Sequence, residues 1–302
     1  MRRVRWFAGL AVLACGLAAV ASAGANKPAP VPGEKAPPPV SAPVSGAAAP
    51  MGYIEVDSSH ITLPAGGQLH GTVSCPAGTV VWGGGVFVNS AEVTAGVNGS
   101  YPLGNTRGWQ GDVFNLSSSE TYFYVSAICA KQPAGYKIVK KSFANPALLQ
   151  SGGLAACPAT ATVIGGGGSS SSPATSISIN SSYPYNVIGK SGWVTEMNNA
   201  SGDSHPTMAT YAVCARKPAP GGLLFDYPSS SPESNPAGQQ VGESANCPGS
   251  GVVISGGMQS SSNELNVNIN ATYPGAPTVW TTYQNNGSSL DQTFKVYAVC
   301  VS

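Results

Sequence analysis

The sequence predicts an all-β protein built of three similar modules, each closed by a disulfide. Three observations lead to this fold class. A set of motifs occurs three times at one fixed spacing, short segments alternate between apolar and polar residues, and six cysteines take equivalent places in the three copies. We expect the modules either as tandem sandwich-like units or as one pseudo-threefold assembly. No stretch has a persuasive helical period.

The repeated unit is defined by motifs that follow one another in the same order. Cys-Pro opens each copy, a glycine-rich step follows eight residues after the cysteine, and Asn-x-(Ser/Thr)-Tyr-Pro begins 23 residues after it. A tryptophan and a second cysteine complete the copy. The openings are at Cys75, Cys157 and Cys247, and the glycine-rich steps begin at Gly83, Gly165 and Ser255. Chance does not hold three copies in one register, so we infer a triplication, with repeats at 53–136, 137–222 and 223–302.

The combination of Cys-Pro, a Gly-Gly-Gly step and a closing Tyr-Ala-x-Cys resembles a repeat of secreted bacterial proteins of unknown function. The resemblance extends over roughly residues 60–302. It implies export and a β module, and it implies no activity. The first repeat departs from this pattern, because it has Val125-Ser126 where the other two have a Thr/Val-Tyr pair.

Period-2 alternation predicts the strands. Residues 265–270 alternate strictly between apolar residues and asparagine, as in a half-buried strand. The closing strand of the third repeat places Phe294, Val296, Ala298 and Cys300 on one face. Its other face is also partly apolar, which predicts a strand inside a sheet. Short strands separated by Gly, Pro, Asn and Ser are typical of a sandwich or barrel.

Two motifs of the repeat have a structural interpretation. The glycine-rich steps are expected to permit a bulge or close backbone packing. Asn-x-(Ser/Thr) is formally a glycosylation acceptor, but the following Tyr-Pro favours a turn whose asparagine caps backbone groups. The segment 222–235 is expected to be a flexible joint, and this slightly favours tandem units over a closed assembly.

The six cysteines of the repeats predict three disulfides. Symmetry leaves two pairings. Pairing within repeats gives Cys75–Cys129, Cys157–Cys214 and Cys247–Cys300. Pairing between neighbours gives Cys129–Cys157, Cys214–Cys247 and Cys300–Cys75. The second pairing needs the ends of the chain to meet in a ring, so we favour the first.

No metal site and no cofactor are predicted. The cysteines lack Cys-x-x-Cys spacing, and the three histidines lack the spacing of metal ligands. These histidines are His60, His70 and His205.

The N-terminus predicts export. Residues 1–23 combine a cationic start, an apolar stretch and the cleavage pattern Ala21-Ser22-Ala23, as in a removable signal peptide. Residues 24–52 are a Pro/Ala-rich linker, and no later segment qualifies as a transmembrane helix. We therefore expect a secreted protein, extracellular or periplasmic. A lipoprotein modified at Cys15 is the minor alternative.

Charge is sparse, which bears on the class of function. Only 9% of residues are charged, against roughly 25% in an ordinary domain, and 14 basic residues face 13 acidic ones. This balance excludes a basic nucleic-acid binder. No position shared by the three repeats is acidic or basic, and no Gly-x-Ser-x-Gly motif is present. We therefore predict that the protein is not an enzyme.

The shared tryptophans and asparagines are the candidate binding residues. The tryptophans either pack on the disulfides as core or form an exposed platform on which a sugar stacks, with the asparagines as hydrogen-bonding partners. The candidates are Trp109, Trp193, Trp280, Asn115, Asn199 and Asn286. The leading hypothesis is a binding or adhesion protein that recognises a polysaccharide or cell-surface glycan. The alternatives are a structural or protective surface protein without a small ligand and, third, a glycan hydrolase that uses Asp112 and Glu196.

Overall fold

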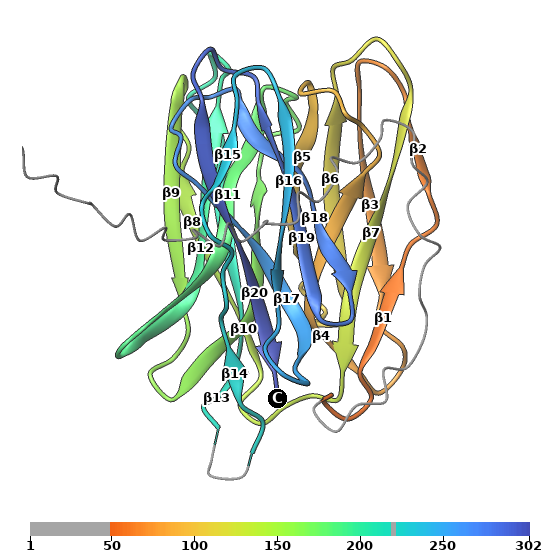
Figure 1. Cartoon of the computed structure of the whole chain (residues 1–302), viewed down its shortest axis with the longest axis vertical. Coiled ribbons are helices and arrows are strands. Elements are labelled where there is room, and N and C mark those ends of the chain that lie inside the picture. Colours follow the sequence, from red (N-terminus) through yellow and green to blue (C-terminus); the bar gives the residue numbers. More distant parts are fainter. Residues whose placement is uncertain (1–48, 219–221) are drawn as a thin grey trace, which may run out of the picture.

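The computed structural model describes residues 49–218 and 222–302, and the regular structure in these residues is entirely β-strand (Figure 1). The strands form three antiparallel sheets, and three disulfides connect them. The prediction of an all-β fold of three disulfide-closed modules is confirmed. The predicted signal peptide, Cys15 and nearly all of the predicted linker lie outside the described residues.

Sheet A joins the first and third repeats. The first repeat supplies β1 (Ile54–Asp57), β2 (Ile61–Leu63), β4 (Val80–Val88) and β7 (Thr121–Ala130). The third supplies β16 (Gln240–Asn246), β18 (Val267–Ala276) and β19 (Val279–Asn286). The order is β1-β7-β4-β18-β19-β16, and β2 also pairs with β7.

Sheet B joins the first and second repeats. The first repeat supplies β3 (Gly67–Ser74), β5 (Ala95–Pro102) and β6 (Gly108–Asn115). The second supplies β8 (Lys137–Ala144), β10 (Ala161–Ser170) and β13 (Thr207–Arg216). The order is β3-β6-β5-β10-β13-β8.

Sheet C joins the second and third repeats. The second repeat supplies β9 (Leu149–Ala156), β11 (Ile177–Val187) and β12 (Lys190–Asn199). The third supplies β14 (Phe225–Asp226), β15 (Glu233–Asn235), β17 (Val252–Ser260) and β20 (Gln292–Val301). The order is β14-β20-β17-β11-β12-β9, and β15 also pairs with β20.

This topology is the closed pseudo-threefold alternative. Each repeat forms a lobe in which its strands from two sheets pack together: β6 on β7, β12 on β13 and β19 on β20. Neighbouring lobes share a sheet, because β5 pairs with β10, β11 with β17 and β18 with β4. The slight preference for tandem units was wrong. Segment 222–235 is not a free joint, because its strands β14 and β15 add to the edge of sheet C through β20.

The glycine-rich step brings the backbones of the lobes together. In the second repeat the register shifts between Val163 and Gly165, as expected for a bulge. A Cβ atom on Gly165 would lie 2.1 Å from the carbonyl oxygen of Trp82, and one on Gly167 would lie 1.9 Å from that of Ser100. Both carbonyls belong to the first repeat. Any side chain at these two positions would therefore force neighbouring lobes apart.

Two rings of side-chain hydrogen bonds run around the three lobes. The asparagines of Asn-x-(Ser/Thr)-Tyr-Pro donate across the lobe boundary, each at 2.9 Å: Asn98 to the carbonyl of Ile177, Asn180 to that of Val267 and Asn270 to that of Ala95. A tyrosine within a few residues of each repeat boundary donates at 2.7 Å to the preceding lobe in the ring. Tyr53 donates to the carbonyl of Val253, Tyr136, which directly precedes β8, to that of Val81, and Tyr227 to that of Val163. The asparagines therefore cap backbone groups, as expected, although they do so from bulged strands and not from turns.

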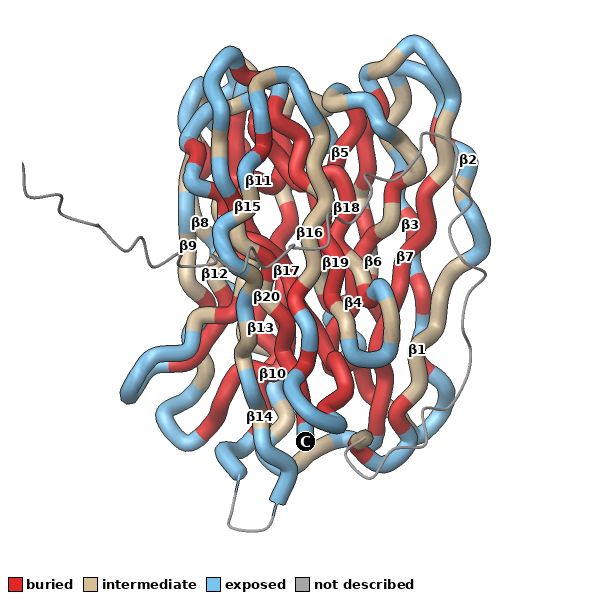
Figure 2. The backbone as a smooth tube through the Cα atoms, viewed as in Figure 1, coloured by how far each residue is buried: buried red, intermediate tan, exposed pale blue. Residues whose placement is uncertain are grey.

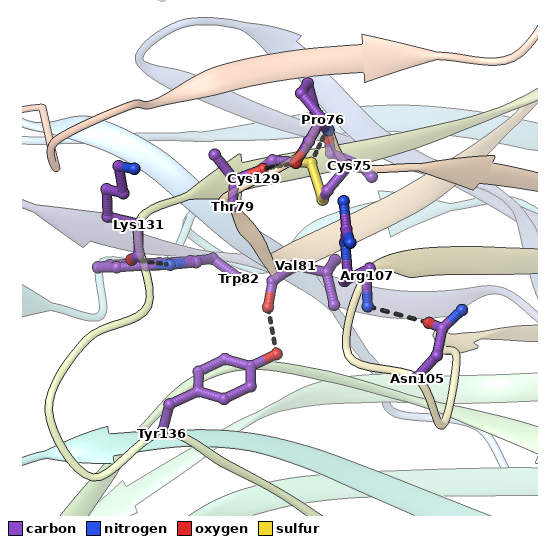
Figure 3. The surroundings of a disulfide bond; sticks show 11 residues. Cys75, Pro76, Thr79, Val81, Trp82, Asn105, Arg107, Cys129, Lys131 and Tyr136 are labelled. Carbon is purple, nitrogen blue, oxygen red and sulfur yellow. Dashed lines mark hydrogen bonds between the residues drawn. A yellow bond between two sulfur atoms is a disulfide. The ribbon is translucent and has the colours of Figure 1, made fainter.

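The disulfides are paired within repeats, which confirms the favoured alternative. They are Cys75–Cys129, Cys157–Cys214 and Cys247–Cys300, with Cα–Cα distances of 5.6, 5.8 and 5.6 Å. Cys75 directly follows a strand of sheet B and Cys129 lies in a strand of sheet A, so each bond ties two sheets together within one lobe. Figure 3 shows the first disulfide beside the hydrogen bond from Tyr136, the residue before β8, to the carbonyl of Val81.

Burial follows the strands, whereas exposed residues gather in the loops at the two ends of the molecule (Figure 2). Every pair of sheets is in contact, so the three lobe interiors form one continuous core. In the described part of the chain, no helix has the length and apolar character needed to cross a membrane.

Candidate functional site

The three shared tryptophans are core residues. Trp109, Trp193 and Trp280 have no exposed surface. Each indole N–H donates to a hydroxyl of its own repeat: to Ser100 at 2.9 Å, to Ser182 at 2.8 Å and to Thr272 at 2.9 Å. Each ring also covers the middle position of the glycine-rich step, where a Cβ atom would lie 2.3 to 2.5 Å from the ring. Of the two interpretations of these residues, core packing is therefore the one found, and they form no exposed platform.

The three asparagines that follow the tryptophans are also fully buried. Each amide nitrogen donates to a backbone carbonyl four residues ahead: Asn115 to Ser119 at 2.8 Å, Asn199 to Asp203 at 2.9 Å and Asn286 to Leu290 at 2.8 Å. Each amide oxygen accepts the backbone N–H of the serine two residues ahead. These side chains hold the loops of the fold, so their polar groups are not presented to a ligand.

The two acids considered for glycan hydrolysis lie on different sheets. Asp112 is in β6 of sheet B, whereas Glu196 is in β12 of sheet C. Asp203 and His205 do contact one another, with 2.8 Å between carboxylate and imidazole nitrogen, but both are largely exposed in a loop. Within the described residues, no group of three His, Cys, Asp or Glu side chains is arranged to hold a metal ion.

Tyrosine pairs lie on the outer faces of the sheets at the boundaries between lobes. On sheet B, Tyr101 of the first repeat stacks on Tyr211 of the second, with ring centroids 5.1 Å apart and planes at 17°. On sheet C, Tyr183 stacks on Tyr297 at 5.6 Å and 23°. Gly167 pairs with Tyr211 and lies one residue from the β10–β5 contact. The rings therefore meet across the third glycine of the step, where no side chain separates them.

Sheet A has a different aromatic arrangement at the equivalent place. Ser126 replaces the tyrosine there and donates a hydrogen bond to Asp57. Tyr273 instead meets the edge of Phe87, with centroids 5.1 Å apart and planes at 85°. Phe87 in turn stacks on Tyr124 at 4.9 Å. The departure of the first repeat from the shared Tyr-Ala-x-Cys motif therefore changes one of the three faces.

A hollow of about 520 Å³ opens on the outer face of sheet B beside the Tyr101 ring. It extends from β3 and β6 across β5 to the end of β10 and the loop that follows. Side chains with hydrogen-bonding capacity dominate its lining, among them Gln68, His70, Asn98, Gln110, Asp112 and Ser171. A site of this size accommodates a small polar ligand or one unit of a longer polymer.

The first repeat differs from the others at this hollow. His70 and Asp112 are directly opposed on β3 and β6, and a Cβ atom on Gly99 would lie 2.2 Å from the Asp112 carboxylate. The Asp112 side chain thus occupies space that the glycine leaves free. At the equivalent place in sheet A, the Tyr283 ring covers Gly242, so the first repeat has histidine and carboxylate where the third has glycine and tyrosine.

Two buried oxygens at the hollow have no hydrogen-bond partner among the described residues: Oδ1 of Asn98 and Oε1 of Gln68. Asn98 is only 2% exposed. Unpaired buried acceptors are unfavourable, and these two atoms have almost no exposed surface, so they are not open to a ligand in the hollow. Burial raises the pKa of the Asp112 carboxyl, and the hydrogen bond from Gln110 at 2.8 Å and the nearby His70 oppose that shift.

The sequence left the tryptophans open between core and surface and did not single out the tyrosines of the outer faces. Both members of each tyrosine pair belong to shared motifs, since Tyr101 and Tyr183 end Asn-x-(Ser/Thr)-Tyr and Tyr211 and Tyr297 begin Tyr-Ala-x-Cys. Alternation along the closing strand was the available signal. It places the tyrosine opposite to the inward-facing alanine and cysteine of the same motif.

Comparison of the chain with protein-family models and with curated proteins found no match.

Proposed function

We propose that this protein is an exported, non-enzymatic carbohydrate-binding protein whose main site is the hollow on sheet B. The observation that carries the proposal is the partly exposed Tyr101 ring, stacked on the buried Tyr211, beside a hollow lined mainly by polar side chains. A sugar ring has an apolar C–H face and a rim of hydroxyl groups. It therefore matches an aromatic surface that is bordered by hydrogen-bonding side chains.

The polar groups around the Tyr101 ring complement hydroxyl groups in both directions. The Asp112 carboxylate accepts hydrogen bonds, whereas the Gln110 amide and serine hydroxyls donate them. A hydroxyl group is donor and acceptor at once, so neighbouring hydroxyls can satisfy both kinds of group. An apolar ligand would leave these groups unpaired, at a cost of about 1–3 kcal/mol for each buried one.

The arrangement of the acids supports binding without hydrolysis. Glycoside hydrolysis commonly needs two carboxyl groups about 5–9.5 Å apart across one cleft. Asp112 is hydrogen-bonded to an amide, Gln110, and no second carboxylate lines the hollow. The pseudo-threefold fold also presents a second tyrosine pair, Tyr183 and Tyr297, on sheet C. A polymer that contacted both faces would gain affinity through effective concentration.

A glycan array followed by affinity electrophoresis in polysaccharide gels tests the proposal. We expect retention of the wild-type chain by at least one polysaccharide. Tyr101→Ala and Asp112→Asn should each weaken retention by about tenfold or more, through lost aromatic contact area and a lost charged acceptor. His205→Ala, in an exposed loop outside the hollow, is the matched control and should bind as the wild type does. Thermal melting verifies that each variant is folded.

Two results would contradict the proposal. One is the absence of retention on every glycan and polysaccharide. The other is retention that Tyr101→Ala and Asp112→Asn leave unchanged, because the ligand would then bind elsewhere on the molecule.

A further inference from the structure

Charge is separated along the direction of the strands. The strands run lengthwise, so the loops gather at two ends (Figure 1). The Cys-Pro pairs directly follow β3, β9 and β16 and lie at one of these ends. The loops and strand ends at this Cys-Pro end expose six cationic side chains: Arg107, Lys131, Lys137, Lys190, Arg216 and Lys217. Asp226, in the short strand β14 that pairs with β20 beside Cys300, is an exposed acid at the same end.

The opposite end has the reverse charge. Its described loops expose five acids and contain neither lysine nor arginine. These acids are Glu92, Glu120, Asp203, Glu264 and Asp291. A nearly neutral chain therefore folds into a molecule with one cationic and one anionic end. Such a molecule is oriented by a charged surface.

The Cys-Pro end also exposes apolar side chains at the tip of the β11–β12 hairpin. Val187 is 50% exposed and Ile188 is fully exposed. Strand β11 has 11 residues where its counterpart β5 in the first repeat has eight, so this hairpin is longer. At the base of the tip, the Lys190 ammonium lies 5.9 Å from the centre of the Tyr185 ring. Apolar, aromatic and cationic groups thus occur together at one projecting turn.

Further exposed apolar residues lie at the same end. Leu224 is 58% exposed in the loop before β14, and Leu223 beside it is 37% exposed. Met51 is 78% exposed, and its carbonyl accepts the backbone N–H of Lys131, which places it at this end. These side chains are distributed around the rim and do not line one groove. An extended, deformable surface such as a lipid membrane can contact all of these side chains, whereas a folded protein partner would need them in one continuous patch.

We propose that the Cys-Pro end docks on an anionic phospholipid membrane, with Val187 and Ile188 inserted at the level of the lipid headgroups. Interfacial binding needs apolar side chains beside lysine and arginine, and this end has both. A soluble polyanion would use the cationic side chains but would gain nothing from the exposed valine and isoleucine. In this orientation the sheet B hollow stays on the side of the molecule, free of the membrane.

Co-sedimentation of the chain from residue 24 onward with lipid vesicles tests this proposal. We expect binding to vesicles of phosphatidylcholine mixed with phosphatidylglycerol, little binding to phosphatidylcholine alone, and loss of binding at high salt. Neutralising Arg216 and Lys217 as glutamine should weaken binding by about fivefold per charge. Val187→Ser with Ile188→Ser should weaken it by about tenfold or more. Leu149→Ser with Leu290→Ser is the control pair.

The control pair removes leucines that are 54% and 58% exposed at the opposite end, so it should leave vesicle binding unchanged. Equal loss in the control and the hairpin variant would overturn the proposal. So would the absence of binding to anionic vesicles. A third outcome would also refute the proposal: vesicle binding could depend on Arg216 and Lys217 but not on Val187 and Ile188, and dextran sulfate could abolish it. That result would assign this end to soluble polyanions.

Discussion

Removal of one disulfide distinguishes a closed fold from three independent lobes. Cys157 and Cys214 are separated by 57 residues in the sequence. In the chain-entropy model, opening a loop of this length lowers the free energy of unfolding by about 4 kcal/mol. The other two loops, at 54 and 53 residues, should cost nearly the same. We replace both cysteines with alanine, because Cys214 has no exposed surface and a hydroxyl would be left unpaired there.

The structure predicts how this loss is distributed. Each lobe shares both of its sheets with its neighbours, and the asparagine and tyrosine rings cross every lobe boundary. An unfolded second lobe would therefore expose β5 and β17 along the edges that now pair with β10 and β11. We expect the Cys157→Ala/Cys214→Ala variant to unfold in one transition at a lower temperature, with all three lobes unfolding together.

Calorimetry and tryptophan fluorescence measure this outcome. Trp109, Trp193 and Trp280 report on one lobe each, and all are fully buried. In the closed fold, each single-tryptophan variant of the disulfide mutant should show one calorimetric peak, and its fluorescence midpoint should coincide with that peak. A first transition confined to Trp193, with Trp109 and Trp280 unchanged up to the wild-type midpoint, would refute the closed arrangement as the source of stability.

Three further predictions concern the packing and the buried acids. Gly166→Ala places a Cβ atom 2.4 Å from a tryptophan ring and should lower the free energy of unfolding by about 1–3 kcal/mol. Gly202→Ala, at a position in open space, is the control and should change the free energy of unfolding by less than about 0.5 kcal/mol. Chemical denaturation measures both variants. Asn180→Ala removes the hydrogen bond to the Val267 carbonyl of the third repeat and should lower the free energy of unfolding by about 1–3 kcal/mol in the same assay. An unchanged free energy of unfolding would mean that the asparagine ring is dispensable for stability. Burial, helped by Asp57, raises the pKa of Glu55 from 4.5 to about 8. The folded state then holds this proton up to about pH 8, whereas the unfolded state releases it near pH 4.5. Stability should therefore fall as pH rises between these values, by at most about 5 kcal/mol, and Glu55→Gln should flatten this part of the pH profile.

The sequence predicted the fold class and the covalent framework because both depend on local or repeated signals. Alternation identifies strands, and cysteines at equivalent places restrict the pairing to two symmetric choices. The choice between tandem and closed lobes depends on contacts between residues far apart in the chain. The oxygen of Ser100 opposite Gly167 is such a contact. A glycine in the sequence indicates that another part of the chain approaches the backbone closely at that position, but it does not identify the approaching strand.

The candidate site was harder to predict for a related reason. Trp193 and Tyr183 both stand at shared positions, and composition alone does not distinguish a core aromatic from a surface one. The indole of Trp193 is buried over a glycine, whereas Tyr183 stacks on the outer face. Burial of the amide of Asn199 follows from the loop that it holds, since its partner is a backbone carbonyl and not a recognisable side chain.

The triplication itself indicates where function is to be sought. Positions shared by the three repeats are occupied by the disulfides, the glycine-rich steps, the asparagine ring and the buried tryptophans, and closure of the fold requires all of them. Most of these positions are buried and have little freedom to contact a ligand, whereas the shared Tyr101 adjoins the hollow on an outer face. The hollow on sheet B depends on His70 and Asp112, and the exposed hairpin tip on Ile188, none of which is shared by all three repeats. Because the buried symmetric residues already hold the lobes together, the residues free to bind are those on the outer faces and at the loop tips, most of which depart from the symmetry. Substitutions there should alter binding while leaving the single unfolding transition intact.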